Sequence, residues 1–138
     1  KNAFSHYFCI LFLQINYTIM SERKIPIYLE CGYSIAMQVL GGKWKICIIE
    51  ALRDKPLRPS LIFKEVPDAT ERVINQQLKE LLEYKIIDRK IYAEQPPRTE
   101  YFLTDLGRSA FPILDALDQW GEENRKFYEE LFNAEDED

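Results

Sequence analysis

Hydrophobic and polar residues follow two different periods in the central part of this chain. Over about residues 70–84, apolar side chains recur every three or four positions, which predicts an amphipathic helix. Over residues 86–92 and again over 99–103, β-branched and aromatic residues alternate with polar ones, which predicts two short strands. The intervening Gln-Pro-Pro sequence at 95–97 is typical of a turn. We therefore expect a helix followed by a β-hairpin.

The predicted helix has one side for a core and one side for solvent or a ligand. Its inward positions are Val73, Ile74, Leu78, Leu81 and Leu82. Its outward positions are Arg72, Asn75, Gln76 and Lys79. Arginine and lysine suit guanine O6 and N7, and asparagine and glutamine suit adenine N6 and N7, so this side matches base edges in a DNA major groove. The alternative is an ordinary solvated helix face, because any surface helix is polar on its outer side.

Shorter helices are expected ahead of this one. Helical spacing predicts a first helix over residues 33–40, a second within 41–52 and a third within 57–66. Pro67 and Asp68 then form the turn into the helix at 70–84. The expected fold class is mainly α with a small β-hairpin.

Residues 104–132 are expected to form a final helical region that pairs two copies of the chain. Thr104 can cap its start, and Pro112 should kink it or split it into two helices. Its apolar side chains exceed what a small domain needs as cover, so a second copy is the natural partner. Those predicted interface residues are Phe111, Leu114, Leu117, Trp120 and Phe127. Folding back onto the same domain is the alternative.

The net charge of −5 argues against a nucleic-acid partner only if the charge is spread evenly, and it is not. Residues 104–138 hold 3 of the 18 basic and 11 of the 23 acidic residues, a net charge of −8 that includes an acidic tail at 133–138. The remainder carries +3. Attraction to phosphate must therefore come from a few placed cations and from pairing of two copies.

Residue types exclude several other classes of protein. Cys9, Cys31 and Cys47 are odd in number and form no CxxC pair, which argues against a disulfide framework or structural zinc and favours a reducing cytoplasm. His6 is the only histidine, and the GxSxG, HExxH and glycine-rich nucleotide-binding motifs are missing from the sequence. We expect no enzyme activity, no metal and no cofactor.

Residues 1–19 are apolar and aromatic, and resemble the core of a signal peptide. Lys1 is their only positive charge, no small-residue cleavage site follows, and the apolar run is too short and interrupted for a membrane span. Met20 begins a more ordinary polar sequence, so we interpret 1–19 as an upstream extension that is not native to the protein. The alternative is an additional helix that packs on the domain or a partner. No membrane association is expected.

Several separated motifs together resemble the HxlR-type winged helix-turn-helix transcriptional regulators, a MarR-like group. The motifs are VLGGKWK at 39–45, TERVINQQLKEL at 70–81, EQPPRTEYFLTDLGR at 94–108 and ILDALDQWGE at 113–122. The resemblance extends from about Tyr28 to Phe127. It implies a winged helix-turn-helix DNA-binding domain over residues 20–103, followed by C-terminal dimerisation helices over 104–132.

The resemblance also implies DNA contacts outside the helix at 70–84. It puts Trp44 in the core, Lys43 or Lys45 close to backbone phosphate, and Arg58 as a further phosphate contact. The prolines at the hairpin tip should project Arg98 toward a minor groove, where negative potential concentrates. An exposed arginine without a ligand is the alternative for Arg98.

Cys31 stands just before the first helix, where the family often has a Cys-Pro pair. In some members that cysteine senses electrophiles or oxidants, and a helix N-terminus can lower the pKa of a thiol. A small buried apolar residue is the alternative for Cys31, and Cys47 is expected in the core. The resemblance thus implies a cytoplasmic homodimer that binds double-stranded DNA at an inverted repeat, most often as a repressor, with a small electrophile or another small molecule as effector. A winged helix that binds protein instead of DNA is the competing hypothesis.

Overall fold

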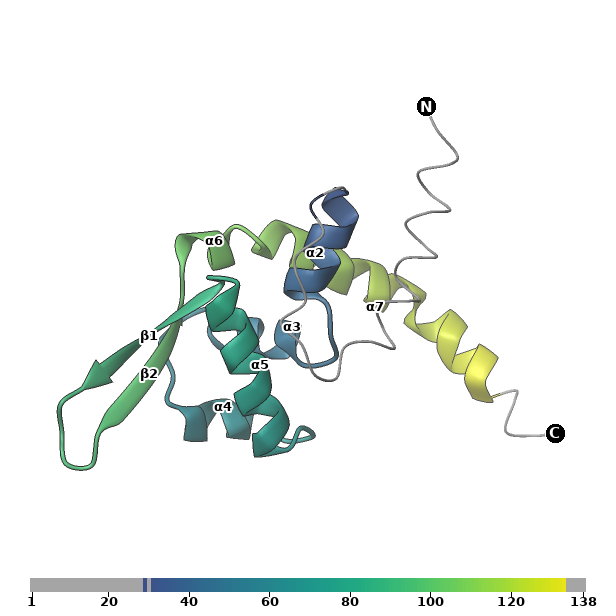
Figure 1. The fold of residues 1–138 in the computed structure, drawn as a ribbon. Helices are drawn as coiled ribbons and strands as arrows, with labels where there is room; N and C mark the ends of the chain where they lie inside the picture. The colour runs from purple at the N-terminus through teal and green to yellow at the C-terminus, as the bar shows by residue number, and fades with distance from the viewer. Residues whose placement is uncertain (1–28, 30, 134–138) are drawn as a thin grey trace.

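The computed structural model describes residue 29 and residues 31–133 of this 138-residue chain. Residues 1–19, and most of the acidic tail, lie outside the described residues. The elements in chain order are α2 (Gly32–Leu40), α3 (Lys45–Ala51), α4 (Pro59–Glu65), α5 (Glu71–Glu83), β1 (Ile87–Tyr92), β2 (Arg98–Leu103), α6 (Asp105–Arg108) and α7 (Phe111–Asn133) (Figure 1). The predicted fold class, mainly helical with one hairpin and a long C-terminal helical region, is confirmed.

Helix α5 begins where the sequence predicts. The Thr70 side chain accepts a hydrogen bond from the backbone N–H of Val73 at 3.3 Å, and Glu71 lies in the first turn, where a negative charge suits the helix dipole. Ile74, Leu78 and Leu81 are buried on the inner side. Val73 was expected among them, but its side chain is 36% exposed because it lies at the edge of the apolar stripe.

The end of α5 is closed by two backbone hydrogen bonds. Ile86 N–H donates to Leu81 O at 3.0 Å, and Lys85 N–H donates to Leu82 O at 3.1 Å. Lys85, which follows the C-cap residue Tyr84, has a positive φ of 60°, a conformation that glycine adopts most easily. This arrangement is a Schellman motif, and it turns the chain directly from α5 into β1.

The hairpin pairs in the antiparallel sense, from Ile87 opposite Leu103 to Tyr92 opposite Arg98. Leu57 forms an isolated antiparallel β-bridge beside the hairpin. Its backbone and that of Tyr101 exchange two hydrogen bonds, of 3.0 and 2.9 Å. Helical spacing in the sequence predicts that Leu57 belongs to a helix. The helix begins two residues later at Pro59, a residue that suits the first helical turn because its missing N–H would have no partner there.

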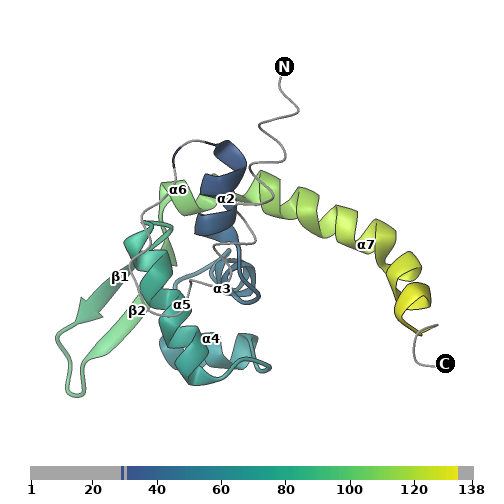
Figure 2. The ribbon, with the colours of Figure 1, turned by 45° about the vertical axis from the view of Figure 1, so that its right-hand side comes forward.

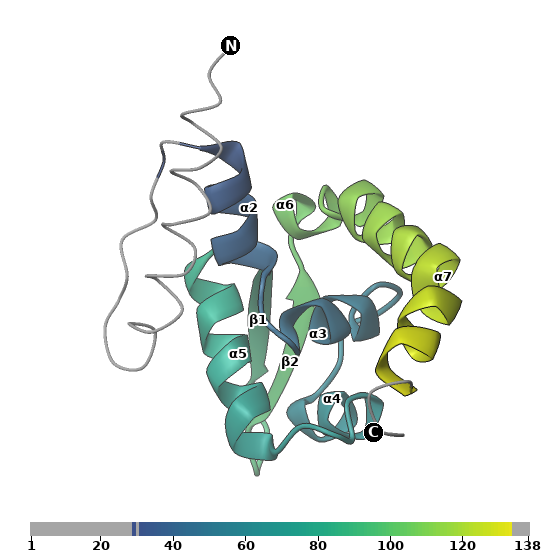
Figure 3. The same ribbon diagram turned by 90° about the vertical axis from the view of Figure 1, so that its right-hand side faces the viewer.

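The core lies between α3, α4, α5 and the base of the hairpin. Its buried hydrophobic residues are Ile48, Ile49, Leu52, Leu57, Ile62, Val66, Ile74, Leu78, Leu81, Ile86, Ile87, Leu103, Ala110 and Leu114. The hairpin extends past this core, and Figure 2 shows α5 standing beside it. Figure 3 places α3 between α5, the helix that is predicted to read DNA, and α7, the helix that is predicted to pair two copies.

The C-terminal region is split into two helices, as Pro112 predicts. Helix α6 is capped by Thr104, whose side chain accepts from Gly107 N–H at 3.0 Å, and α7 begins at Phe111, so that Pro112 falls in its first turn. Arg53 fixes the start of α7 against the domain. Its guanidinium hydrogen-bonds Asp115 and lies 3.9 Å from the centre of the Phe111 ring. Hydrogen bonds to Glu50 and Asp115 raise the pKa of Arg53.

Candidate nucleic-acid interface

Helices α4 and α5 form a helix-turn-helix, and the structure brings the predicted reading residues together on α5. The four predicted reading residues are all exposed, namely Arg72, Asn75, Gln76 and Lys79. Because Ile74 and Leu78 are buried on the opposite side, the orientation of α5 is fixed by the core. The exposed side of α5 therefore offers two cations and two amides on a rigid element.

Lys45 was expected near DNA phosphate, and this prediction is wrong. Its side chain is 2% exposed, and the ammonium group lies 2.8 Å from a carboxylate oxygen of Glu80 and 3.3 Å from the backbone oxygen of Gln38. It also lies 5.2 Å from the centre of the Tyr84 ring. A buried ammonium is tolerated only when it is paired and hydrogen-bonded, and Lys45 meets both conditions. Burial raises the pKa of Tyr84, and the charges of Glu80 and Glu83 add to this effect, so the phenol beside Lys45 stays neutral.

Lys43 and Arg58 are exposed and remain candidate phosphate contacts. The Lys43 ammonium lies 4.6 Å from the centre of the Trp44 ring, which is only partly buried against the core. Arg58 occupies the position before α4 in an extended conformation. Both cations therefore lie close to the start of a helix on the domain that carries α5.

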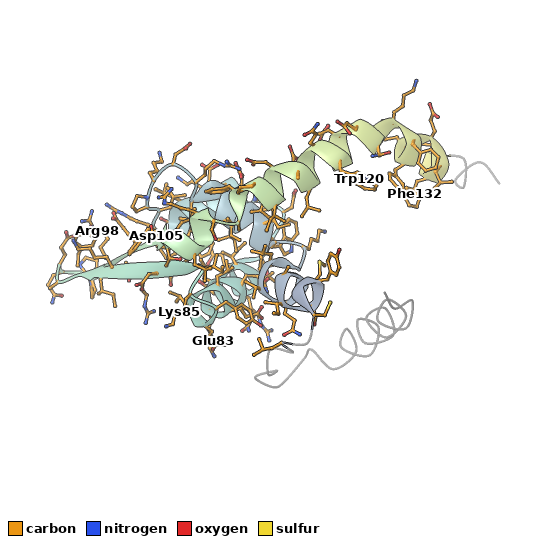
Figure 4. The ribbon with its side chains drawn as sticks, turned by 90° about the horizontal axis from the view of Figure 1, so that it is seen from above. Glu83, Lys85, Arg98, Asp105, Trp120 and Phe132 are labelled. Carbon is orange, nitrogen blue, oxygen red and sulfur yellow. The ribbon has the colours of Figure 1, made fainter. Side chains whose placement is uncertain are left out.

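Arg98 does not project from the hairpin tip. It is the first residue of β2, and its guanidinium lies 3.3 Å from Glu94, 3.6 Å from Glu100 and 4.1 Å from the centre of the Tyr92 ring. Two carboxylates and an aromatic face hold this side chain against the hairpin, which leaves it 27% exposed. Figure 4 shows Arg98 at the end of the hairpin farthest from α7. Contact with DNA at this position would require exchange of the carboxylates for phosphate.

A hollow between α5 and the hairpin was missed by the sequence analysis. It is lined by Asn75, Lys79, Leu82, Glu83, Arg89 and Tyr101. Two of the predicted reading residues on α5 thus share one surface depression with Arg89 of β1. Arg89 is on the same side of β1 as the buried Ile87, and only the folded hairpin shows that it shares this hollow with Lys79.

The predicted pairing residues divide into two groups. Leu114 is 4% exposed and Phe111 is partly buried against the core, so both serve their own domain, and the prediction of Leu114 as an interface residue is wrong. Leu117, Trp120 and Phe127 are 54%, 57% and 62% exposed. Exposed apolar residues that the prediction omitted are Ile113, Tyr128, Leu131 and Phe132. Figure 4 shows Trp120 and Phe132 along the part of α7 that leaves the domain.

The two cysteines in the described part of the chain differ in their surroundings. Cys31 is half-buried and occupies the position immediately before α2. Cys47 was expected in the core, but it is exposed on α3, where its thiol lies 3.9 Å from the backbone oxygen of Lys43. The buried side of α3 is occupied by Lys45, Ile48 and Ile49 instead. Within the described residues, no helix combines the length and the apolar character needed to cross a membrane.

Comparisons with known proteins agree with this geometry. Residues 39–129 match the family model for the HxlR-like helix-turn-helix. An HTH-type transcriptional regulator of Methanothermobacter thermautotrophicus is 44% identical over 91 residues, which cover 66% of this chain and 70% of that protein. The regulator YkvN of Bacillus subtilis is 39% identical over 92 residues, which cover 67% of this chain and 78% of YkvN.

Solved structures agree with the fold as well. The redox regulator HypR in its reduced form superposes with a TM-score of 0.69 at 34% identity, over 72% of this chain and 99% of HypR. A MarR-family regulator of Porphyromonas gingivalis superposes with a TM-score of 0.65 at 36% identity, over 74% of this chain and 99% of that one. The matched family is one of transcriptional regulators and not of enzymes. The chain therefore belongs to the HxlR-like helix-turn-helix family of transcriptional regulators.

Proposed function

We propose that this protein is a sequence-specific DNA-binding repressor that acts in the cytoplasm as a homodimer on an inverted-repeat operator. The observation that carries the proposal is the exposed set on α5, Arg72, Asn75, Gln76 and Lys79. Arginine and lysine suit guanine, and asparagine and glutamine suit adenine, so α5 can read base edges when it enters a major groove. Lys43 and Arg58 would contact the phosphate backbone beside it, and contacts of that kind fix orientation without reading sequence.

An inverted-repeat operator requires a dimer, and the exposed apolar side chains of α7 support pairing of two copies through this helix. Leu117, Trp120 and Phe127 are more than half exposed on a helix that leaves the domain, so a second copy of α7 would cover them. Two domains related by a two-fold axis present two copies of α5. Such dimers read half-sites about 34–36 Å apart, one turn of the DNA helix.

A salt titration tests DNA binding against the protein-binding alternative. Binding of the purified protein to labelled duplex from its own upstream region is followed by fluorescence anisotropy over a range of salt concentrations. The logarithm of the association constant should fall with the logarithm of salt by about 0.9 for each phosphate that is neutralised. A slope near zero would exclude electrostatic DNA binding and favour a winged helix that binds protein.

Regulation by a thiol-reactive effector is a second part of the proposal, carried by Cys31. This thiol is half-buried immediately before α2, and a helix N-terminus favours the thiolate. Similar proteins include the redox regulator HypR, solved in reduced and oxidised forms, and YodB of Bacillus subtilis, solved in a reduced form and after diamide treatment. A small electrophile or oxidant is the corresponding effector for this chain.

A further inference from the structure

One carboxylate connects the buried lysine of α3 to the exposed side of α5. One oxygen of Glu80 lies 2.8 Å from the Lys45 ammonium, and the other accepts a hydrogen bond from the side-chain amide of Gln76 at 3.2 Å. Lys45 is 2% exposed, Glu80 is 27% exposed and Gln76 is exposed. The three side chains therefore form a chain of contacts from the core to the proposed DNA-reading surface.

Lys45 holds the Glu80 carboxylate in place. Its ammonium has a second acceptor in the Gln38 backbone oxygen, so the lysine is fixed from α2 as well as from α5. Because the ammonium is almost fully buried, the ion pair is little screened by solvent. The carboxylate thus keeps a defined position beside Gln76.

An ionised carboxylate can accept hydrogen bonds but cannot donate them. The NH₂ group of Gln76 must therefore face Glu80, and its carbonyl oxygen must point elsewhere. A glutamine without such a neighbour can rotate its amide by half a turn and exchange donor for acceptor. Glu80 fixes the orientation of the Gln76 amide. It accepts only one of the two amide protons, so the other proton stays available.

We propose that Glu80, held by Lys45, is a positioning residue that gives Gln76 a preference for adenine. This inference rests on the proposed function. The Gln76 oxygen accepts from adenine N6, and its remaining amide proton donates to adenine N7. Guanine presents acceptors at both O6 and N7. The fixed Gln76 oxygen would therefore face guanine O6, and two acceptors would oppose each other with no proton between them.

The test compares base preferences of matched variants, determined by selection from a random-sequence DNA library and then by competition binding. Gln76→Ala identifies the base position that Gln76 reads. Glu80→Gln, which can donate as well as accept, should lower the preference for adenine at that same position by about tenfold, the scale of one bidentate base contact. Glu129→Gln is the charge-matched control, because Glu129 is exposed on α7, away from the reading side of α5, and loses the same charge. It should change affinity for all sequences alike.

A second variant guards against loss of folding. Lys45→Met with Glu80→Met replaces the ion pair by apolar side chains, an exchange that often leaves stability unchanged or raises it. This double variant removes the acceptor beside Gln76 and should weaken the adenine preference, as Glu80→Gln does, while its thermal unfolding stays cooperative.

Retention of the wild-type adenine preference in both Glu80→Gln and the double variant would overturn the inference, although the proposed function would stand. A selected site with a base other than adenine at the Gln76 position would overturn it too. If the wild-type protein enriches no sequence from the library, the proposed function fails, and the inference fails with it.

Discussion

Gly107 of α6 lies so close to the backbone oxygen of Ile86 that an added Cβ would be 2.1 Å from it. Thr104 binds the same turn, because its N–H donates to Ile86 O at 3.1 Å and its hydroxyl donates to Lys85 O at 2.6 Å. The turn that ends α5 is thus joined to the segment that leaves the hairpin. The orientation of the wing and the start of the C-terminal region both depend on this contact.

Substitution of Gly107 by alanine should destabilise the fold by about 2–3 kcal/mol, because the methyl group would meet backbone atoms that cannot move independently. Urea denaturation measures the change. Gly32→Ala is the control, since an added Cβ there has nothing within 4 Å. Equal stability of Gly107→Ala and wild type would show that α6 does not pack on the turn as described.

Lys85→Gly should stabilise the protein by about 1 kcal/mol, the cost of holding a residue other than glycine in the left-handed conformation. Lys85 has a φ of 60° at the Schellman motif, and its side chain is exposed. Lys85→Ala removes the same charge but keeps the backbone cost, so it should leave the unfolding midpoint close to that of wild type. A lower midpoint for Lys85→Gly than for Lys85→Ala would argue against the positive φ.

Trp120→Ser combined with Phe127→Ser should give a folded monomer with weakened DNA binding, because both side chains are exposed on α7 and outside the core. Light scattering gives the mass, and circular dichroism reports the fold. Lys126→Ser is the control on the same helix, since its side chain is 88% exposed. A dimer that survives the double substitution would place the pairing surface elsewhere.

Cys31→Ser should bind DNA like wild type but fail to respond to a quinone or diamide, if Cys31 is the sensor. Labelling followed by mass spectrometry should show Cys31 reacting faster than Cys9 and Cys47. Exposure alone would favour faster labelling of Cys47, because Cys47 is the more exposed of the two thiols in the described residues. An equal response of wild type and Cys31→Ser would remove Cys31 from the proposal.

Local signals made much of the fold predictable from the sequence. A capping threonine, apolar residues at helical spacing and a change of period after α5 mark that helix and the strands that follow it, and these signals depend only on neighbours in the chain. Pro112 marks the break before α7 for the same reason. The exposure of Arg72, Asn75, Gln76 and Lys79 follows from the burial of the residues between them.

Several errors concern residues whose partners lie far away in the sequence. A lysine near the start of a helix is usually exposed, and Lys45 is buried because Glu80 on another helix supplies its counter-charge. Leu57 is extended because it pairs with Tyr101, which the local period cannot reveal. The partners of Arg98 are close in sequence, but only the strand register brings Tyr92 opposite it.

The central claim is that the exposed side of α5 reads DNA sequence, and discrimination between sites tests it most directly. Affinity for a selected operator and for a scrambled duplex is measured at one salt concentration for wild type, Arg72→Ala, Gln76→Ala and Lys126→Ala. We predict that the Arg72 and Gln76 variants lose about 1–3 kcal/mol of discrimination, the scale of one base contact, and that the α7 control keeps it. Full discrimination in both α5 variants would contradict the account.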